Sequence, residues 1–323
     1  MIVKFSNTGV AFCIVLSFIS MGCNQGHKNE KNSAIQEEKV ELPIEAITVF
    51  GDTLRTPSIR DGKSKENFEI ARDAYVKFPD STELLIWYGR RTAYLGHFKK
   101  AIEIYSEGIK KYPKDPRLFR HRGHRYISTR QYDKAISDLE NAAVLAENMV
   151  DEIEPDGLPN IKNIPLGTLK GNIWYHLGLA YYLKGNYNKA LKAFQQREVT
   201  NRYDDNLVSG GYWLFMILKR LGRDKEALEA ISEIEHGLDI IENKSYYDMC
   251  LFYKGLLKEE NIKINGDASS SDDVYYYALG NWHLYQEKDT IEAKEFYLEL
   301  LKNGNPYSFA YLTAEADWKH FFD

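Results

Sequence analysis

Apolar residues recur at intervals of three and four positions through most of the sequence after residue 61, which is the pattern of helices with one buried face. Short turns that contain glycine, such as those at Gly96 and Gly185, separate neighbouring helical segments. The pattern therefore predicts helices joined in antiparallel pairs. Residues 64–78 and 309–321 are also helix-like, and we expect them to cap the two ends of the array.

The helical segments repeat with a fixed period. Gly89 and Gly123 are 34 residues apart, and Ala101 and Ala135 have the same separation. Two tandem units therefore occupy residues 82–149, and their small residues allow the two helices of a unit to cross closely. A third unit begins at Gly171, and weaker units follow around residues 214–231 and 277–297. We expect an all-α array of about five helical pairs.

One segment breaks the period between the second and third units. Residues 150–170 form an insertion that contains Pro155, Gly157, Pro159 and Pro165, which are typical of turns. Insertions in repeat arrays map to one face, which is often the binding face. The insertion also carries several acidic residues, which we expect to dock against arginines of the second unit.

The third unit resembles a tetratricopeptide repeat, which is a helix-turn-helix unit that stacks into a solenoid. The resemblance depends on its spacing of aromatic and small residues, namely Trp174, Leu177, Gly178, Tyr181, Gly185, Tyr187, Ala190 and Phe194. The strings at 120–125, 154–160, 172–179 and 277–285 further resemble an uncharacterised group of bacterial tetratricopeptide proteins. That second resemblance implies the fold and no particular activity.

In tetratricopeptide folds the first helix of each unit lines a concave groove, so the resemblance implies a set of ligand-facing residues. Its cationic members would lie at one end of the groove and its aromatic members at the other. We expect the groove to contain Arg90, Arg117, Arg120, His124, Tyr175, Tyr182, Tyr212 and Trp213. The alternative is that the arginines form a solvated face paired with the acidic insertion.

Arg122 and the histidines of the second unit need separate interpretations. Arg122 falls where the repeat normally has a buried apolar residue, so we expect it to hold Glu154 or Asp156 of the insertion. His121 and His124 are close enough on one helix to share a metal ion, but the neighbouring arginines repel a cation. We therefore expect no metal and no cofactor.

The first residues resemble an export signal with a lipid attachment site. An apolar run at residues 10–19 is too short to span a bilayer, and small residues lead into Cys23. We expect a lipoprotein signal peptide at 1–22, acylation of Cys23 and a disordered tether at 23–60; the alternative is an ordinary secretory signal. Asn24 is not the residue that retains enteric lipoproteins at the inner membrane, so the cell envelope and its outer membrane are favoured. Cys250 then has no disulfide partner, and we expect a buried, inert thiol.

Composition and motifs narrow the possible functions. A net charge of −5 gives no case for nucleic acid. The sequence has no GxSxG, HExxH, GxxxxGK[ST] or GxGxxG motif, so we expect no enzyme activity. Our leading hypothesis is a lipid-anchored envelope adaptor that binds a protein or peptide partner, either acidic or held by its C-terminal carboxylate. The alternatives are a glycan-binding lipoprotein of a polysaccharide uptake system and a hydrolase of envelope polymers.

Overall fold

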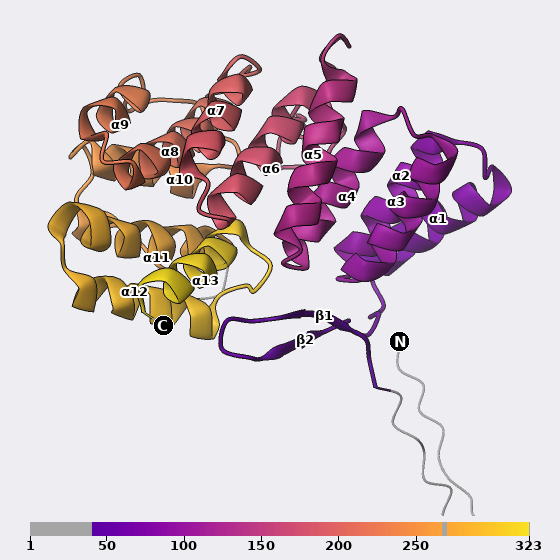
Figure 1. Cartoon of the computed structure of the whole chain (residues 1–323), viewed down its shortest axis with the longest axis horizontal. Helices are drawn as coiled ribbons and strands as arrows, with labels where there is room; N and C mark the ends of the chain where they lie inside the picture. The colour runs from indigo at the N-terminus through magenta and orange to yellow at the C-terminus, as the bar shows by residue number, and fades with distance from the viewer. Residues whose placement is uncertain (1–40, 267–269, 323) are drawn as a thin grey trace, which may run out of the picture. The chain divides into compact units, whose positions relative to one another are not determined.

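A computed structural model of the protein describes residues 41–266 and 270–322, and all its helices and strands lie in the compact unit Leu42–Asp323 (Figure 1). The proposed signal peptide, Cys23 and most of the tether lie outside the described residues. A β-hairpin comes first and is followed by helices to the end of the unit.

The first nine helices are α1 (Lys63–Lys77), α2 (Thr82–Tyr94), α3 (Phe98–Lys111), α4 (Pro116–Ser128), α5 (Tyr132–Ala146), α6 (Leu169–Leu183), α7 (Tyr187–Glu198), α8 (Asp204–Arg220) and α9 (Asp224–Ala230). They are followed by α10 (Lys244–Tyr253), the short 3-10 helix η1 (Glu259–Asn261), α11 (Ser270–Trp282), the π-helical turn η2 (His283–Glu287), α12 (Thr290–Asn303) and α13 (Phe309–Phe321). The expected end helices are present as α1 and α13.

Local sequence signals explain where the first helices of the units begin. The hydroxyl of Ser81 accepts a hydrogen bond from the Leu84 amide, and Asp115 caps α4 directly before Pro116. The hydroxyl of Thr168 caps α6 in the same way. Gly185, with a φ of 72°, makes the turn from α6 to α7, because a side chain would be strained there.

The two helices of each unit cross as closely as the small residues require. A Cβ added at Gly89 would lie 2.5 Å from the Tyr105 ring, and one added at Gly178 would lie 2.6 Å from the Phe194 ring. Ala101 and Ala135 are fully buried between their helices. The expectation of closely crossing helical pairs is therefore confirmed in the first three units.

The second half of the array departs from a simple succession of pairs. Helices α10, α11 and α13 pack over α6 and α8 and build one large aromatic core with them (Figure 1). At its centre a guanidinium nitrogen of Arg220 lies 2.8 Å from Asp317, and the Tyr277 hydroxyl donates to the same carboxylate at 3.0 Å. The array therefore closes on its own C-terminal helices.

The β-hairpin corrects the expected tether at 23–60. Strands β1 (Ile44–Ile47) and β2 (Thr53–Arg55) pair antiparallel, and Glu45 is buried between the hairpin and α3. Its carboxylate accepts hydrogen bonds from the Lys99 amide at 2.8 Å and the Thr56 hydroxyl at 2.6 Å. The segment is thus ordered well before residue 61, because a buried carboxylate that caps a helix holds it in place.

Helix α13 occupies part of the side lined by the first helices of the units. The ring of Phe309 lies 5.6 Å from His124 and 5.7 Å from His176, between centroids. Arg130 at the α4–α5 turn contacts Glu315 of α13 at 3.1 Å and donates to the carbonyl of Pro306 at 2.7 Å. This part of the expected groove is filled by the protein's own chain.

No helix within the described residues has both the length and the apolar character needed to cross a membrane.

Candidate functional site

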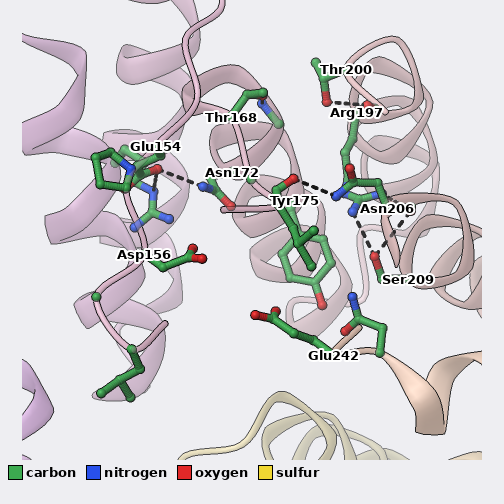
Figure 2. Close-up of a pocket in the computed structure, with 18 of the residues that line it drawn as sticks. Glu154, Asp156, Thr168, Asn172, Tyr175, Arg197, Thr200, Asn206, Ser209 and Glu242 are labelled. Carbon is green, nitrogen blue, oxygen red and sulfur yellow. Dashed lines mark hydrogen bonds and ion pairs between the residues drawn. The ribbon is translucent and has the colours of Figure 1, made fainter. Parts of the chain in front are cut away.

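One part of the groove stays open as a cavity of about 380 Å³ between the insertion and the first helices of four units (Figure 2). We call it the insertion cavity. It is lined by Arg90, Tyr94, Arg120, residues 154–158 and 166–168, Gly171, Asn172, Tyr175, Arg197, Thr200, Asn206, Ser209, Glu242 and Asn243. Its volume is in the range of small-molecule and peptide side-chain pockets.

Several backbone and side-chain contacts hold the insertion as the outer wall of this cavity. Arg91 of α2 donates to the Gly157 carbonyl at 2.7 Å, and Asn206 of α8 donates to the Leu166 carbonyl at 3.1 Å. Ile153 and Thr168 form an isolated antiparallel bridge at the base of the loop. The insertion is therefore anchored to repeat units on both sides of it.

The strongest electrostatic anchor is Glu154. Its carboxylate lies 3.2 Å from Nε of Arg120 and 3.1 Å from Nε2 of His121, and it accepts a hydrogen bond from the side-chain Nδ2 of Asn172 at 2.8 Å. Burial raises the pKa of Glu154, but Arg120 and His121 outweigh that effect and hold the pKa well below its usual range. The carboxylate therefore remains charged inside the wall.

His121 is neutral in this arrangement. Burial lowers its pKa to about 3, and the positive charge of Arg120 acts in the same direction. Its Nδ1 lies 2.9 Å from an Arg120 nitrogen, which can only donate, so Nδ1 accepts and Nε2 carries the proton toward Glu154. Because His121 lies on α4, its contact with Glu154 helps to fix the insertion to that helix without adding a charge.

The first two units carry more positive charge than Glu154 neutralises. Within the described residues, Arg90 and Arg125 have no carboxylate within ion-pair distance. Arg90 lies 4.5 Å from the centre of the Trp87 ring and 3.4 Å from the Tyr94 hydroxyl, and it lines the insertion cavity. Burial lowers the pKa of Arg125 to about 10, and the charges of Arg120 and Arg90 add to that shift. This end of the cavity can attract an anion.

Two acidic residues also face the cavity. Asp156 of the insertion and Glu242, in the segment before α10, point their carboxylates into the cavity and toward one another (Figure 2). Burial raises the pKa of Asp156, and the carboxylate of Glu242 acts in the same direction, whereas the positive charge of Arg90 opposes both effects. Tyr175 lines the same cavity, and its hydroxyl accepts a hydrogen bond from Nε1 of Trp213 at 3.0 Å.

Three of the residues expected from the sequence, Arg90, Arg120 and Tyr175, line the insertion cavity together. Arg117 lies outside it and pairs with Asp115 and Glu83, each at 2.7 Å. His124 is not in the cavity lining and packs against His176 and Phe309, with a centroid distance of 4.2 Å to His176. The expected cationic set therefore divides between the cavity, the outer surface and the packing against α13.

The expectation of an aromatic end of the groove was wrong for three of its residues. Tyr182, Tyr212 and Trp213 are 2%, 0% and 1% exposed. Tyr182 shares a hydrogen bond of 2.7 Å with Tyr277 of α11, and Tyr212 packs on Tyr246 of α10. These rings lie inside the core because the C-terminal helices cover them, so none offers an exposed face in the insertion cavity.

The prediction for Arg122 was also wrong. Its guanidinium makes a two-pronged ion pair with Asp138 of α5, at 2.7 and 2.8 Å, and donates to Ser106 at 3.0 Å. It therefore joins the helices of adjacent units, and Arg120 holds the insertion instead. The broader expectation that the acidic insertion docks on arginines of this helix is confirmed for Glu154.

Sequence reasoning missed the far side of the cavity. Glu242, Asn206, Ser209 and Arg197 come from irregular or weakly patterned parts of the third and fourth units. Arg197 donates to the Ser209 hydroxyl and the Asn206 carbonyl, both at 2.8 Å. No sequence motif marked these residues. Glu242 reaches the cavity only because the loop before α10 folds toward it.

In the described part of the chain, no group of three or more His, Cys, Asp or Glu side chains is arranged to hold a metal ion. Cys250 is fully buried, and burial raises the pKa of its thiol. The expectation of an inert cysteine is confirmed.

Comparisons with known proteins support the repeat architecture. A model of the tetratricopeptide repeat family matches residues 171–196, which span most of α6 and α7, the third helical pair. This segment is a tetratricopeptide repeat. The helical pairs before and after it have the same helix-turn-helix arrangement, so the helices of the described chain form an α-solenoid of the tetratricopeptide type, preceded by the β-hairpin. Folds of this type present binding surfaces and support a protein-interaction scaffold.

Solved structures resemble parts of this solenoid at low sequence identity. A tetratricopeptide repeat protein from Parabacteroides merdae is 17% identical, with 79% of this chain and 92% of that chain covered and a TM-score of 0.44. YrrB, described as a tetratricopeptide protein with an unusual peptide-binding site, is 15% identical, with 76% and 97% covered and a TM-score of 0.42. MamA is 17% identical, with 67% and 93% covered and a TM-score of 0.37. A search of curated proteins gave no match.

Proposed function

We propose that this protein is a non-enzymatic scaffold that binds a peptide segment of a partner protein in the insertion cavity. A carboxylate of that segment, from an acidic side chain or from its C-terminus, would pair with Arg90. The observation that carries the proposal is that Arg90 lines the cavity without a carboxylate partner among the described residues. An unpaired guanidinium offers five donors in a fixed plane, which suits a two-pronged contact with a carboxylate.

The shape of the remaining space favours a short segment over a whole helix. Helix α13 fills the lower part of the groove at His124 and His176, and the C-terminal helices cover the third and fourth units. The insertion closes the outer side of the cavity through Glu154 and Gly157. A ligand can therefore insert one or two residues, with the rest of the partner on the surface around the insertion.

We further propose that the scaffold belongs to the cell envelope and is held on the outer membrane by a lipid on Cys23. The apolar run at 10–19 and the small residues before Cys23 support this part of the proposal. Residues 24–40, which are polar and charged, would act as the tether. Metabolic labelling with a palmitate analogue should mark the wild type and leave a Cys23→Ser variant unlabelled.

Quantitative affinity capture from envelope extract tests the binding role. We expect Arg90→Gln to reduce recovery of the partner about tenfold or more, since a charge-assisted hydrogen bond is worth about 1.5–3 kcal/mol. Arg117→Gln is the matched control, because it removes one charge from an arginine that lies outside the cavity. Equal recovery with Arg90→Gln and Arg117→Gln would remove the cavity from the proposal.

A further inference from the structure

The acidic residues of the insertion cavity differ in their ion pairs. Glu154 lies within ion-pair distance of Arg120 and accepts a hydrogen bond from the Asn172 side chain, although its Oε1 makes no hydrogen bond. Oδ2 of Asp156 is buried without a hydrogen-bond partner, and the exposed Glu242 side chain has no ion pair, among the described residues. A buried acceptor that has lost water and gained no donor is costly, so a donor from a ligand would be favourable there.

The carboxylates of Asp156 and Glu242 face the same space. Both point into the cavity near Tyr175, and each comes from an irregular segment, the insertion for Asp156 and the segment before α10 for Glu242 (Figure 2). The negative charge of Glu242 opposes ionisation of Asp156, which places the two groups within electrostatic reach of one another. A cation between them would satisfy both at once.

Arg90 in the same cavity limits which ligands fit. Arg90 has no carboxylate within ion-pair distance in the described chain, so a ligand that carried only a positive charge would leave it without a counter-charge. A ligand that carried only a negative charge would approach Asp156 and Glu242 as well as Arg90, and the two carboxylates would repel it. A ligand with both charges matches the arginine and the two carboxylates.

We propose that the insertion cavity recognises a zwitterionic group, with a carboxylate at Arg90 and an ammonium or guanidinium group between Asp156 and Glu242. The chemical class is an amino acid or a peptide end that bears a basic side chain. This inference depends on the proposed function for its carboxylate contact and adds the cationic half of the ligand. It assigns Asp156 and Glu242 as specificity-determining residues.

Three matched probes separate the two charges. Acetyl-Gly-Lys carries the carboxylate and the ammonium group, acetyl-Gly-norleucine keeps only the carboxylate, and acetyl-Gly-Lys-amide keeps only the ammonium group. Isothermal titration calorimetry on the purified protein should show saturable binding of acetyl-Gly-Lys and binding about tenfold or more weaker for each singly charged probe. Free lysine, measured beside acetyl-Gly-Lys, distinguishes an amino acid from a peptide end as the source of the zwitterion.

Variants then connect each charge to its residue. The double variant Asp156→Asn with Glu242→Gln should bind acetyl-Gly-Lys as weakly as the wild type binds acetyl-Gly-norleucine, and Arg90→Gln should weaken both carboxylate probes. Glu152→Gln is the control, since Glu152 is an exposed acid of the same insertion outside the cavity lining. Thermal unfolding of each variant checks that the fold is intact.

The outcomes separate this inference from the proposed function. Equal affinity for acetyl-Gly-Lys and acetyl-Gly-norleucine, with both weakened by Arg90→Gln, would overturn the zwitterion and leave the carboxylate contact standing. Absence of saturable binding of acetyl-Gly-Lys up to about 10 mM, a limit that corresponds to only about 3 kcal/mol of binding, would also overturn it. The capture experiment tests the scaffold role separately, because it measures recovery of the partner with Arg90→Gln and Arg117→Gln.

Discussion

Residues expected to face the groove differ in exposure between the two halves of this solenoid. In the first two units Arg90 and Arg120 line an accessible cavity, whereas in the third and fourth units Tyr175 lines the cavity but Tyr182 and Tyr212 are inside the core. The difference arises from what covers each half, since α10, α11 and α13 pack over α6 and α8 while a loop encloses the first two units. A repeat position therefore sets the direction of a side chain, and the neighbouring elements decide whether a ligand can reach it.

The charged groups of the two halves also differ in purpose. Arg220 and Asp317 neutralise one another inside the C-terminal core, with hydroxyls of Tyr277 and Tyr297 on the same carboxylate. Arg90 has no such partner within the described residues and remains beside the cavity. We infer that the C-terminal charges serve the fold and that the unpaired charges of the first units serve recognition.

The largest expected effect comes from breaking the buried pair of the second half. Asp317→Asn leaves the Arg220 side chain, which is 0% exposed, without a counter-charge, so we expect the free energy of unfolding to fall by about 3–5 kcal/mol. Urea denaturation measures this loss. Arg117→Gln, at an exposed pair, should change stability by about 0.5 kcal/mol or less. Similar losses for both variants would erase the distinction between the two halves.

The next effect concerns the wall of the cavity. Glu154→Gln removes the charge that pairs with Arg120, so we expect limited proteolysis within residues 150–168 to accelerate about tenfold or more. Arg122→Gln breaks the pair with Asp138 and should leave cleavage of the insertion nearly unchanged. The reverse ranking would restore Arg122 as the anchor and contradict the arrangement of the wall.

The pH dependence of stability sharpens the comparison in the first half. The folded pKa of His121 is about 3, below the value of about 6.5 in an unfolded chain. Its contribution to stability is therefore complete above about pH 6.5 and is lost as the pH falls toward 3. At pH 5 the loss from this residue is about 2 kcal/mol.

Denaturation at pH 7 and pH 5 tests this sign and size. The His121→Gln variant should show a smaller loss between the two pH values than the wild type, because it has no buried imidazole to protonate on unfolding. His236→Gln, at an exposed histidine, should behave like the wild type. An unchanged pH dependence in His121→Gln would show that the site is not buried and neutral as described.

Local signals in the sequence were sufficient to locate the helical pairs. Gly89 and Gly123 each mark a close crossing within one pair, and Gly185 marks the turn between two helices of one pair. Each signal acts over a few residues or one repeat length, so periodicity alone could locate the helices. The β-hairpin was missed because Glu45 is fixed by Lys99 and Thr56, and its contact with α3 is distant in sequence.

The candidate site was predictable only in part, because long-range packing decides exposure. Arg90, Arg120 and Tyr175 were found from their repeat positions, and the cavity brings them together. Tyr212 follows the same helical spacing and Trp213 lies one position along, but α10 and α11 cover them, and no local pattern predicts that closure. Glu242 lies in an irregular segment whose path depends on the packing of α8 and α10.

Site-specific photo-cross-linking tests most directly whether the insertion cavity is the binding surface. Leu158 lines the cavity and is 68% exposed, whereas Ile161, three residues later in the insertion, is 95% exposed and outside the cavity lining. With a benzoylphenylalanine at either position in living cells, we predict a discrete partner adduct from position 158, its loss in the Arg90→Gln background, and little adduct from position 161. Adducts of equal yield from both positions, unaffected by Arg90→Gln, would contradict the account.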